Sequence, residues 1–329
     1  MKDNKNNQLS KNIESKVDKK KNIPEEKGSI FLTILIITIL SALGVLFYLK
    51  YHKNQLAHYK IINNNLVTEG SGLYADTYET GLNTEKPFTS KYYFRGKNVN
   101  NYLVLANKCF RIVNIAQNNA LKIMYVGKTN NSICENMDTE QLVIKWDEKG
   151  KNIWSESSIK TYLEDWAKEL GLDESPYIIQ DATWYVGGLK FFEGESLTSD
   201  IKNERNSDLN DETIYNGMIG LINASDYLKA NEKICFAGAF KDLGQCGENN
   251  YLNNERNFWT MNKTYNDNER VWAVERALIS VEKEEVEKNL IQSKYSNNDN
   301  FEVHPVVYLK ANLVLKGYGT ATKPYFIAQ

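Results

Sequence analysis

One uncharged apolar block near the start of the chain constrains this protein more than any other feature. Residues 29–49 (SIFLTILIITILSALGVLFYL) contain no charged side chain. As an α-helix, about twenty such residues span roughly 30 Å, the thickness of the hydrocarbon core of a bilayer. Ile, Leu, Val and Phe occur on all sides of this helix, whereas a helix at a globular surface has a polar stripe. We therefore predict a transmembrane helix over 29–49, with the lipid bilayer as its partner.

The residues that flank the block predict an uncleaved anchor. A signal peptide has a shorter apolar region and then a small-residue cleavage site, but this block continues directly into Lys50 and Lys53. The first 27 residues carry eight lysines and five acidic residues, hence +3, in a chain with a net charge of -2. By the positive-inside rule the N-terminus is cytoplasmic and the C-terminal domain extracellular. We expect a single-pass protein of the cell membrane.

Composition divides the chain into four parts. Residues 1–28 have few large apolar side chains and predict a disordered cytoplasmic tail before the 29–49 helix. Residues 50–70 predict a stalk that extends the anchor helix and breaks at an Asn run and Gly70. Residues 71–329 predict an extracellular α+β domain, and a subdivision near residue 150 is left open.

Within this domain, short apolar runs between Asn, Gly and Lys turns predict a mostly antiparallel sheet with a few helices. The clearest helix covers residues 159–170, with Ser157 or Ser158 as N-cap and Gly171 as its end. The polar segment 193–213 predicts a surface excursion or a short exposed helix. The remaining predicted elements are strands at 92–95, 102–105, 109–115, 120–126, 141–146, 177–179, 182–186, 214–222, 257–261, 271–274, 277–281, 304–309, 313–315 and 325–327, and a short helix that reaches Leu228.

The four cysteines all lie in the part predicted to be extracellular, where disulfides persist. They form two local pairs, Cys109 with Cys134 and Cys235 with Cys246, and we predict that each pair is bonded. Two other connectivities are possible, and four free, buried cysteines are a further alternative. Neither pair has CxxC spacing and the chain has only three histidines, which argues against a zinc site.

A search for reaction motifs finds no P-loop, no GxSxG, no GxGxxG after a strand and no HExxH, so we predict no catalytic residue and no cofactor. His304, directly before Pro305, is interpreted as a packed or edge-strand histidine. The segments 266–269 and 297–300 offer oxygen ligands for calcium but lack the spacing of a known calcium loop. The near balance of 40 basic and 42 acidic side chains argues against nucleic acid as a partner.

Aromatic residues are abundant, with six tryptophans and twenty tyrosines. Their rings could line a surface for a glycan or a peptide, but short strands rich in aromatic residues usually fill a core with them. We predict that most of the rings are buried. The sequence does not indicate which of them would form a binding surface.

A progression of short segments runs through residues 90–329. It comprises Tyr92–Gly96, Val99–Tyr102, Phe110–Val113, Gly220–Tyr227, Phe258–Met261, Val271–Val274, His304–Lys310, Gly317–Thr320 and Pro324–Tyr325. This progression resembles an uncharacterised family of membrane-anchored surface proteins of low-GC Gram-positive bacteria, some of which share the local cysteine pairs. The chain departs from the family pattern at His304, where arginine is usual, and at Cys109-Phe110, where tryptophan is common. The C-terminal half is also similar in pattern to C-type-lectin-like and formylglycine-generating-enzyme-like folds.

Three functions follow as hypotheses. The first is a non-catalytic surface protein that recognises an extracellular glycan, protein or envelope component. The second is a pilin-like subunit, because some members of the family have pilin-type N-termini and Lys27-Gly28 resembles a prepilin cleavage site, although Thr33 stands where pilins have glutamate. The third is an enzyme on a lectin-like fold, for which variants at Asp226 or His304 would be the test.

Overall fold

The computed structural model describes residues 25–78, 86–189, 204–205, 213–231, 249–253, 256–281, 284–298 and 301–328. The chain divides into two compact units, one up to Lys53 and one from Asn54 onward. The predicted exposed segment 193–213 lies largely outside the described residues, and Cys235 and Cys246 lie entirely outside them.

The first unit contains most of helix α1, Glu25–Gln55. Its segment from Ser29 onward is long and apolar enough to cross a membrane, and none of its most apolar stretch is buried within the protein. A core helix of a globular domain would bury such side chains. The apolar helix expected near the N-terminus is therefore present, and it fits a membrane anchor or a signal sequence.

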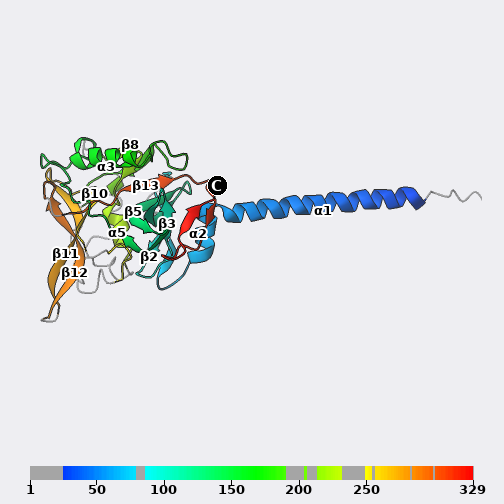
Figure 1. Ribbon diagram of the computed structural model, residues 1–329, viewed down its shortest axis with the longest axis horizontal. Helices are drawn as coiled ribbons and strands as arrows, with labels where there is room; N and C mark the ends of the chain where they lie inside the picture. Colours follow the sequence, from blue (N-terminus) through cyan, green and yellow to red (C-terminus); the bar gives the residue numbers. More distant parts are fainter. Residues whose placement is uncertain are drawn as a thin grey trace, which may run out of the picture. The chain divides into compact units, whose positions relative to one another are not determined.

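Helix α2, Ala57–Asn65, belongs to the second unit, which differs from the stalk expected over residues 50–70. Ala57 and Ile61 are fully buried in the core, and the Ala57 backbone N–H donates to Leu313 O at 2.8 Å. Asn65 Nδ2 donates to the Tyr325 hydroxyl at 3.0 Å. Helix α2 thus lies beside the C-terminal residues of the chain (Figure 1), and its buried side chains Ala57 and Ile61 belong to the core.

The main sheet of the described residues has ten strands. The path β14-β15-β3-β4-β5-β13-β9 runs across it, while β2 pairs with β1 and β4, and β6 pairs with β5. Only β15 and β3 pair in parallel among these strands. The strands are β1 Gly72–Ala75, β2 Ser90–Arg95, β3 Tyr102–Leu105, β4 Lys108–Ala116, β5 Leu121–Asn130, β6 Ile133–Asp138, β9 Ile219–Gly220, β13 Val306–Leu309, β14 Leu315–Lys316 and β15 Tyr325–Ile327.

Local turn chemistry explains the central hairpins. Ala106 and Asn107, between β3 and β4, both have positive φ, as a two-residue hairpin loop requires. The turn between β4 and β5 uses Asn119 at φ 64°, and Asn118 Oδ1 accepts from the Ala120 N–H at 3.0 Å. These turns set the register that places Arg111 opposite both Tyr102 and Met124.

Two smaller sheets and three short helices complete the described part of the second unit. Helix α3 begins at the predicted cap, where Ser157 Oγ accepts from the Lys160 N–H at 3.4 Å, and it ends before Gly171, whose φ is +65°. The elements are β7 Ala182–Tyr185 with β8 Ile214–Gly217, then β10 Phe258–Lys263, β11 Arg270–Val281 and β12 Glu284–Tyr295, and the helices η1 Trp154–Glu156, α3 Ser158–Glu169 and α5 Ala224–Lys229.

Several predicted strands need correction. Residues 141–146 form no strand, because Val143 makes a single bridge to Glu302 and the neighbouring backbone bonds are irregular. Residues 177–179 likewise contain one isolated bridge. The two strands predicted at 271–274 and 277–281 are one strand, β11, and its partner β12 was not predicted, because its sequence is rich in charged residues and has no long apolar run.

The fold class is nevertheless α+β, with one apolar N-terminal helix and a sheet-rich remainder of few helices. The tryptophans lie in its core, as expected for most of the rings: Trp146, Trp154, Trp166, Trp184, Trp259 and Trp272 are all at most 8% exposed. None of them provides the exposed aromatic surface that the sequence left as an alternative.

Candidate functional site

The central strands present a row of neighbouring side chains on one face of the main sheet. Tyr102 of β3 pairs directly with Arg111 of β4, and Arg111 pairs with Met124 of β5. Directly paired residues of antiparallel strands project from the same face. All three line a cavity of about 250 Å³, which we call the Arg111 pocket.

The segment 249–253 covers this row. The Tyr251 N–H donates to Gly96 O at 3.0 Å, and Asn250 Nδ2 donates to Tyr227 O in α5 at 3.1 Å. The Leu252 N–H donates in turn to Asn250 Oδ1 at 2.9 Å. These bonds connect the segment to both the sheet and α5, and they place Tyr251 beside Arg111.

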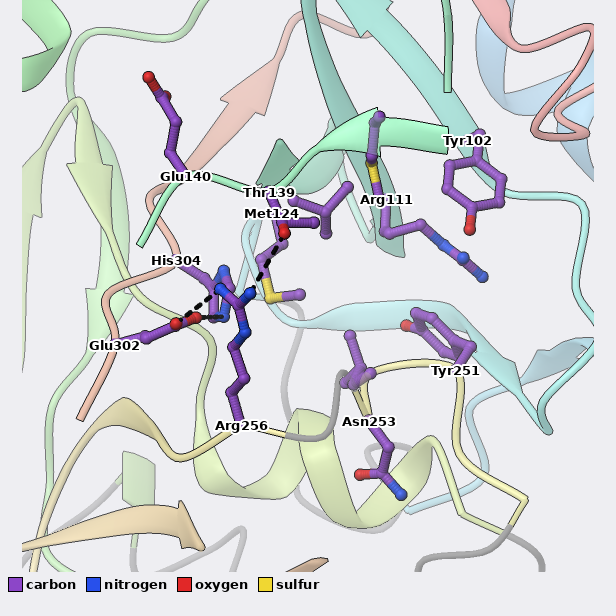
Figure 2. A pocket seen from close by; sticks show the side chains of 13 residues that line it. Tyr102, Arg111, Met124, Thr139, Glu140, Tyr251, Asn253, Arg256, Glu302 and His304 are labelled. Carbon is purple, nitrogen blue, oxygen red and sulfur yellow. Dashed lines mark hydrogen bonds and ion pairs between the residues drawn. The ribbon is translucent and has the colours of Figure 1, made fainter. Parts of the chain in front are cut away.

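Arg111 has an unusual position for a cation, because it is 93% buried and has little to pair with. Its guanidinium lies 3.9 Å from the centroid of the Tyr102 ring and 5.1 Å from that of Tyr251 (Figure 2). Its exposed fraction is 7%, and its Nε has no hydrogen-bond partner. Burial lowers its pKa, and the two tyrosines oppose that shift only in part. No carboxylate among the described residues forms an ion pair with it.

The opposite side of the pocket carries a compact polar group. Arg256 Nη1 donates to Glu302 Oε1 at 2.8 Å, and its Nη2 donates to Thr139 Oγ1 at 3.3 Å. His304 Nε2 lies 3.7 Å from Glu302 Oε2. Figure 2 shows this group across the pocket from Arg111, with Met124 between them.

His304 is neutral at physiological pH. Burial lowers the pKa of its ring to about 4. Its Nδ1 lies 3.2 Å from Tyr125 O, a carbonyl that can only accept, so Nδ1 carries the proton and Nε2 is an acceptor. Burial also raises the pKa of Glu302, although Arg256 opposes this. This side of the pocket therefore offers hydrogen-bond acceptors as well as the Arg256 donors.

Glu140 lines the pocket but is engaged elsewhere. Its carboxylate accepts from the Tyr125 hydroxyl at 2.6 Å and forms ion pairs with Lys108 and Lys128. Burial raises its pKa, but the bonds from Lys128 and Tyr125 outweigh burial and keep the pKa below its usual value. In Figure 2 its side chain points away from Arg111, so it does not neutralise that cation.

A disulfide fixes the edge of the pocket. Cys109 in β4 and Cys134 in β6 are bonded, with their Cα atoms 5.7 Å apart. This is one of the two local pairs predicted from the sequence. It holds β6 beside the central strands, and Met137 and Thr139, which line the pocket, lie at the end of this strand and just after it.

Asp226, one of the two residues considered for an enzymatic role, lies in the first turn of α5, in a separate polar cluster with side chains of β4 and β5. Lys122 Nζ donates to Asp226 Oδ2 at 2.6 Å and to Asn223 Oδ1 at 2.8 Å, and Asn114 Nδ2 donates to Asp226 Oδ1 at 3.1 Å. Burial would raise the pKa of Asp226, but Lys122 and Lys229 hold it below its usual value. We call Asn114, Lys122, Asn223 and Asp226 the α5 cluster.

The other candidates from the sequence have structural roles or lie outside the described residues. Asp267 Oδ1 accepts from the N–H groups of Glu269 and Arg270, which closes the turn before β11. Of the segment 297–300, only the first two residues are described. Among the described residues, no group of three or more His, Cys, Asp or Glu side chains converges as metal ligands would.

Sequence reasoning drew His304 to attention but missed Arg111, Tyr251 and Glu302 as site residues. The available signal was Arg111 itself, a lone arginine within the apolar run 109–115. Its partners lie far away along the chain, and only the folded sheet brings them together.

Searches of protein-family models, curated proteins and solved structures found no significant match to this chain. The assignment of a function thus depends on the Arg111 pocket and on the apolar helix.

Proposed function

We propose that this protein is a single-pass membrane protein whose C-terminal unit lies outside the cell and recognises a ligand in the Arg111 pocket. One observation supports ligand recognition above all. Arg111 is buried at the wall of a cavity, and it has no carboxylate partner among the described residues. Removing a charge from water costs several kcal/mol unless it is paired. A site with such an unpaired charge is suited to a ligand that supplies the opposite charge.

Three observations support the membrane and extracellular parts of the proposal. The helix from Ser29 is apolar and unburied, and the tail before it carries a net charge of +3. The Cys109–Cys134 disulfide is suited to an oxidising compartment. The resemblance to membrane-anchored surface proteins of Gram-positive bacteria, and the C-type-lectin-like pattern of the C-terminal half, belong to the same proposal.

The anchor is tested by intact mass and N-terminal sequencing of the protein recovered from membranes, with and without reduction. A chain that begins at Met1 is expected. A chain that begins at Ser29 would favour the pilin-like subunit, and cleavage after the apolar helix would show a signal peptide.

Recognition is tested on the full chain in detergent by hydrogen–deuterium exchange, with and without a hydrolysate of the cell envelope. We expect slower exchange in 102–111 and 249–253, the segments that hold Tyr102, Arg111 and Tyr251. Unchanged exchange throughout the C-terminal unit would contradict recognition of an envelope component.

A further inference from the structure

The Arg111 pocket also constrains the chemical class of its ligand, an inference that rests on the proposed recognition function. Its volume of about 250 Å³ exceeds the roughly 150 Å³ of an engineered cavity that binds benzene. A molecule of the size of one monosaccharide or one amino acid therefore fits. A polymer would have to present a single residue to the pocket.

The charge of the pocket selects an anion with one negative charge. Arg256 is paired with Glu302 at 2.8 Å, and Glu140 is paired with Lys108 and Lys128. Arg111 lines the pocket as a cation with no carboxylate partner among the described residues. The planar fork of a guanidinium matches a carboxylate in a bidentate manner. A single guanidinium neutralises one negative charge, so Arg111 by itself would pair only one of the two charges of a phosphate dianion.

The rest of the lining selects hydroxyl groups and an apolar ring face. Arg256 donates to Glu302 at 2.8 Å and to Thr139 at 3.3 Å, and because a guanidinium has five N–H donors and a carboxylate accepts at both oxygens, Arg256 and Glu302 can each bond a further polar group. A hydroxyl group both donates and accepts, so it can satisfy either kind. Met124, Val126 and Leu252 line the wall between the two polar ends. The ligand therefore needs an apolar surface as well as polar groups.

From these contacts we infer that the Arg111 pocket binds a small hydroxylated monocarboxylate, of the class of the hexuronic acids. Its carboxylate would pair with Arg111 between Tyr102 and Tyr251. Its hydroxyl groups would meet Glu302, His304 and Arg256 on the opposite side. The ligand would thereby supply the missing counterion of the buried guanidinium.

The test is titration calorimetry of the full chain in detergent with glucuronate, compared with glucose, glucuronate methyl ester and glucose 6-phosphate. We expect glucuronate to bind at least about tenfold more tightly than each of the other three. Arg111→Met should weaken glucuronate binding at least about tenfold, whereas Arg276→Met, the same change at an exposed arginine, should alter it less than about twofold. Arg111→Gln serves as a second variant, and cooperative unfolding of each variant establishes that it is folded.

The two proposals fail in different ways. Equal binding of the acid and its methyl ester, or no glucuronate binding at millimolar concentrations, would overturn the monocarboxylate class. If envelope hydrolysate still slowed exchange around the pocket, recognition would stand with a different ligand. If exchange were unchanged as well, recognition itself would fail. Unaltered glucuronate affinity in a folded Arg111→Met variant would place the carboxylate elsewhere and contradict the site.

Discussion

Two buried cations on adjacent strands of the same sheet have opposite surroundings. Lys122 in β5 is 2% exposed and lies between a carboxylate and an amide oxygen, at 2.6 and 2.8 Å. Arg111 in β4 is 7% exposed, and its guanidinium lies against the rings of Tyr102 and Tyr251. The first cation has its counterion within the protein, whereas the second has none among the described residues and, in our proposal, obtains one from a ligand.

The largest loss of stability is expected when the buried ion pair between Lys122 and Asp226 is broken. Asp226→Asn leaves Lys122 buried without a counterion, and it should lower the free energy of unfolding by about 3–5 kcal/mol. Urea unfolding would measure this change. The matched control is Asp165→Asn on α3, where the carboxylate is 66% exposed and 3.9 Å from Lys168. This variant should stay within about 0.5 kcal/mol of the wild type. Equal effects of the two variants would mean that the α5 cluster is not structural.

The second largest loss of stability is expected when the disulfide at the edge of the Arg111 pocket is removed. Replacing both Cys109 and Cys134 by serine removes a disulfide that joins residues 25 positions apart in the sequence. The loop-entropy relation gives a loss of about 3–4 kcal/mol. Urea unfolding of the oxidised wild type and the double variant would measure it. Faster hydrogen exchange is expected in β6, residues 133–138. A double variant of unchanged stability would show that β6 is held without the disulfide.

A pH dependence follows from His304 on the polar side of the pocket. Burial lowers its pKa to about 4 in the folded protein, against about 6.5 in an unfolded chain. Between these values the unfolded chain binds more protons, so stability falls as the pH decreases from about 6.5 to about 4. The loss of stability amounts to about 3 kcal/mol when the pH reaches about 4, and above about pH 6.5 this group causes no loss.

His304→Gln keeps a polar side chain at this position and removes the titration. Its unfolding free energy should therefore decrease less than that of the wild type as the pH falls through this range. Urea unfolding at several pH values measures the difference. Parallel pH profiles for the two proteins would show that His304 is not kept neutral by burial.

The smallest effect tests how Tyr102 supports Arg111. Tyr102→Leu removes the ring 3.9 Å from the guanidinium, and the lost cation–π interaction should cost about 1 kcal/mol. In a protein that already carries Arg111→Met, Tyr102→Leu should no longer cost this cation–π contribution to the free energy of unfolding. A double-mutant cycle on unfolding free energies isolates the difference. A zero coupling energy would mean that the ring does not stabilise the cation.

Local patterns in the sequence predicted part of the fold for clear physical reasons. The helix after Ser157 combines a capping hydroxyl, an apolar face and a terminating glycine, which all act within a few residues. The central strands are apolar runs between turn residues. Strand β12 was missed because its pairing with β11 rests on a long backbone ladder that does not require an apolar pattern.

The site was less accessible to sequence reasoning. Arg111, Tyr251 and Glu302 lie in three segments far apart in the chain, and each is ordinary on its own. The register of the central hairpins and the bonds of segment 249–253 bring them together. A single sequence does not encode these contacts in a local pattern. The lone arginine in an apolar strand was the one visible sign.

The most direct test of this account compares Arg111→Met with Lys122→Met in urea unfolding of the ligand-free protein. Both changes replace a buried cation by an apolar side chain. We predict that Arg111→Met leaves the unfolding free energy unchanged or higher, because no carboxylate among the residues that the structure describes loses its partner. Lys122→Met should lower it by about 3–5 kcal/mol, because Asp226 is left buried and unpaired. A comparable loss for Arg111→Met would show that Arg111 is part of the structural core and contradict its role as a cation kept for a ligand.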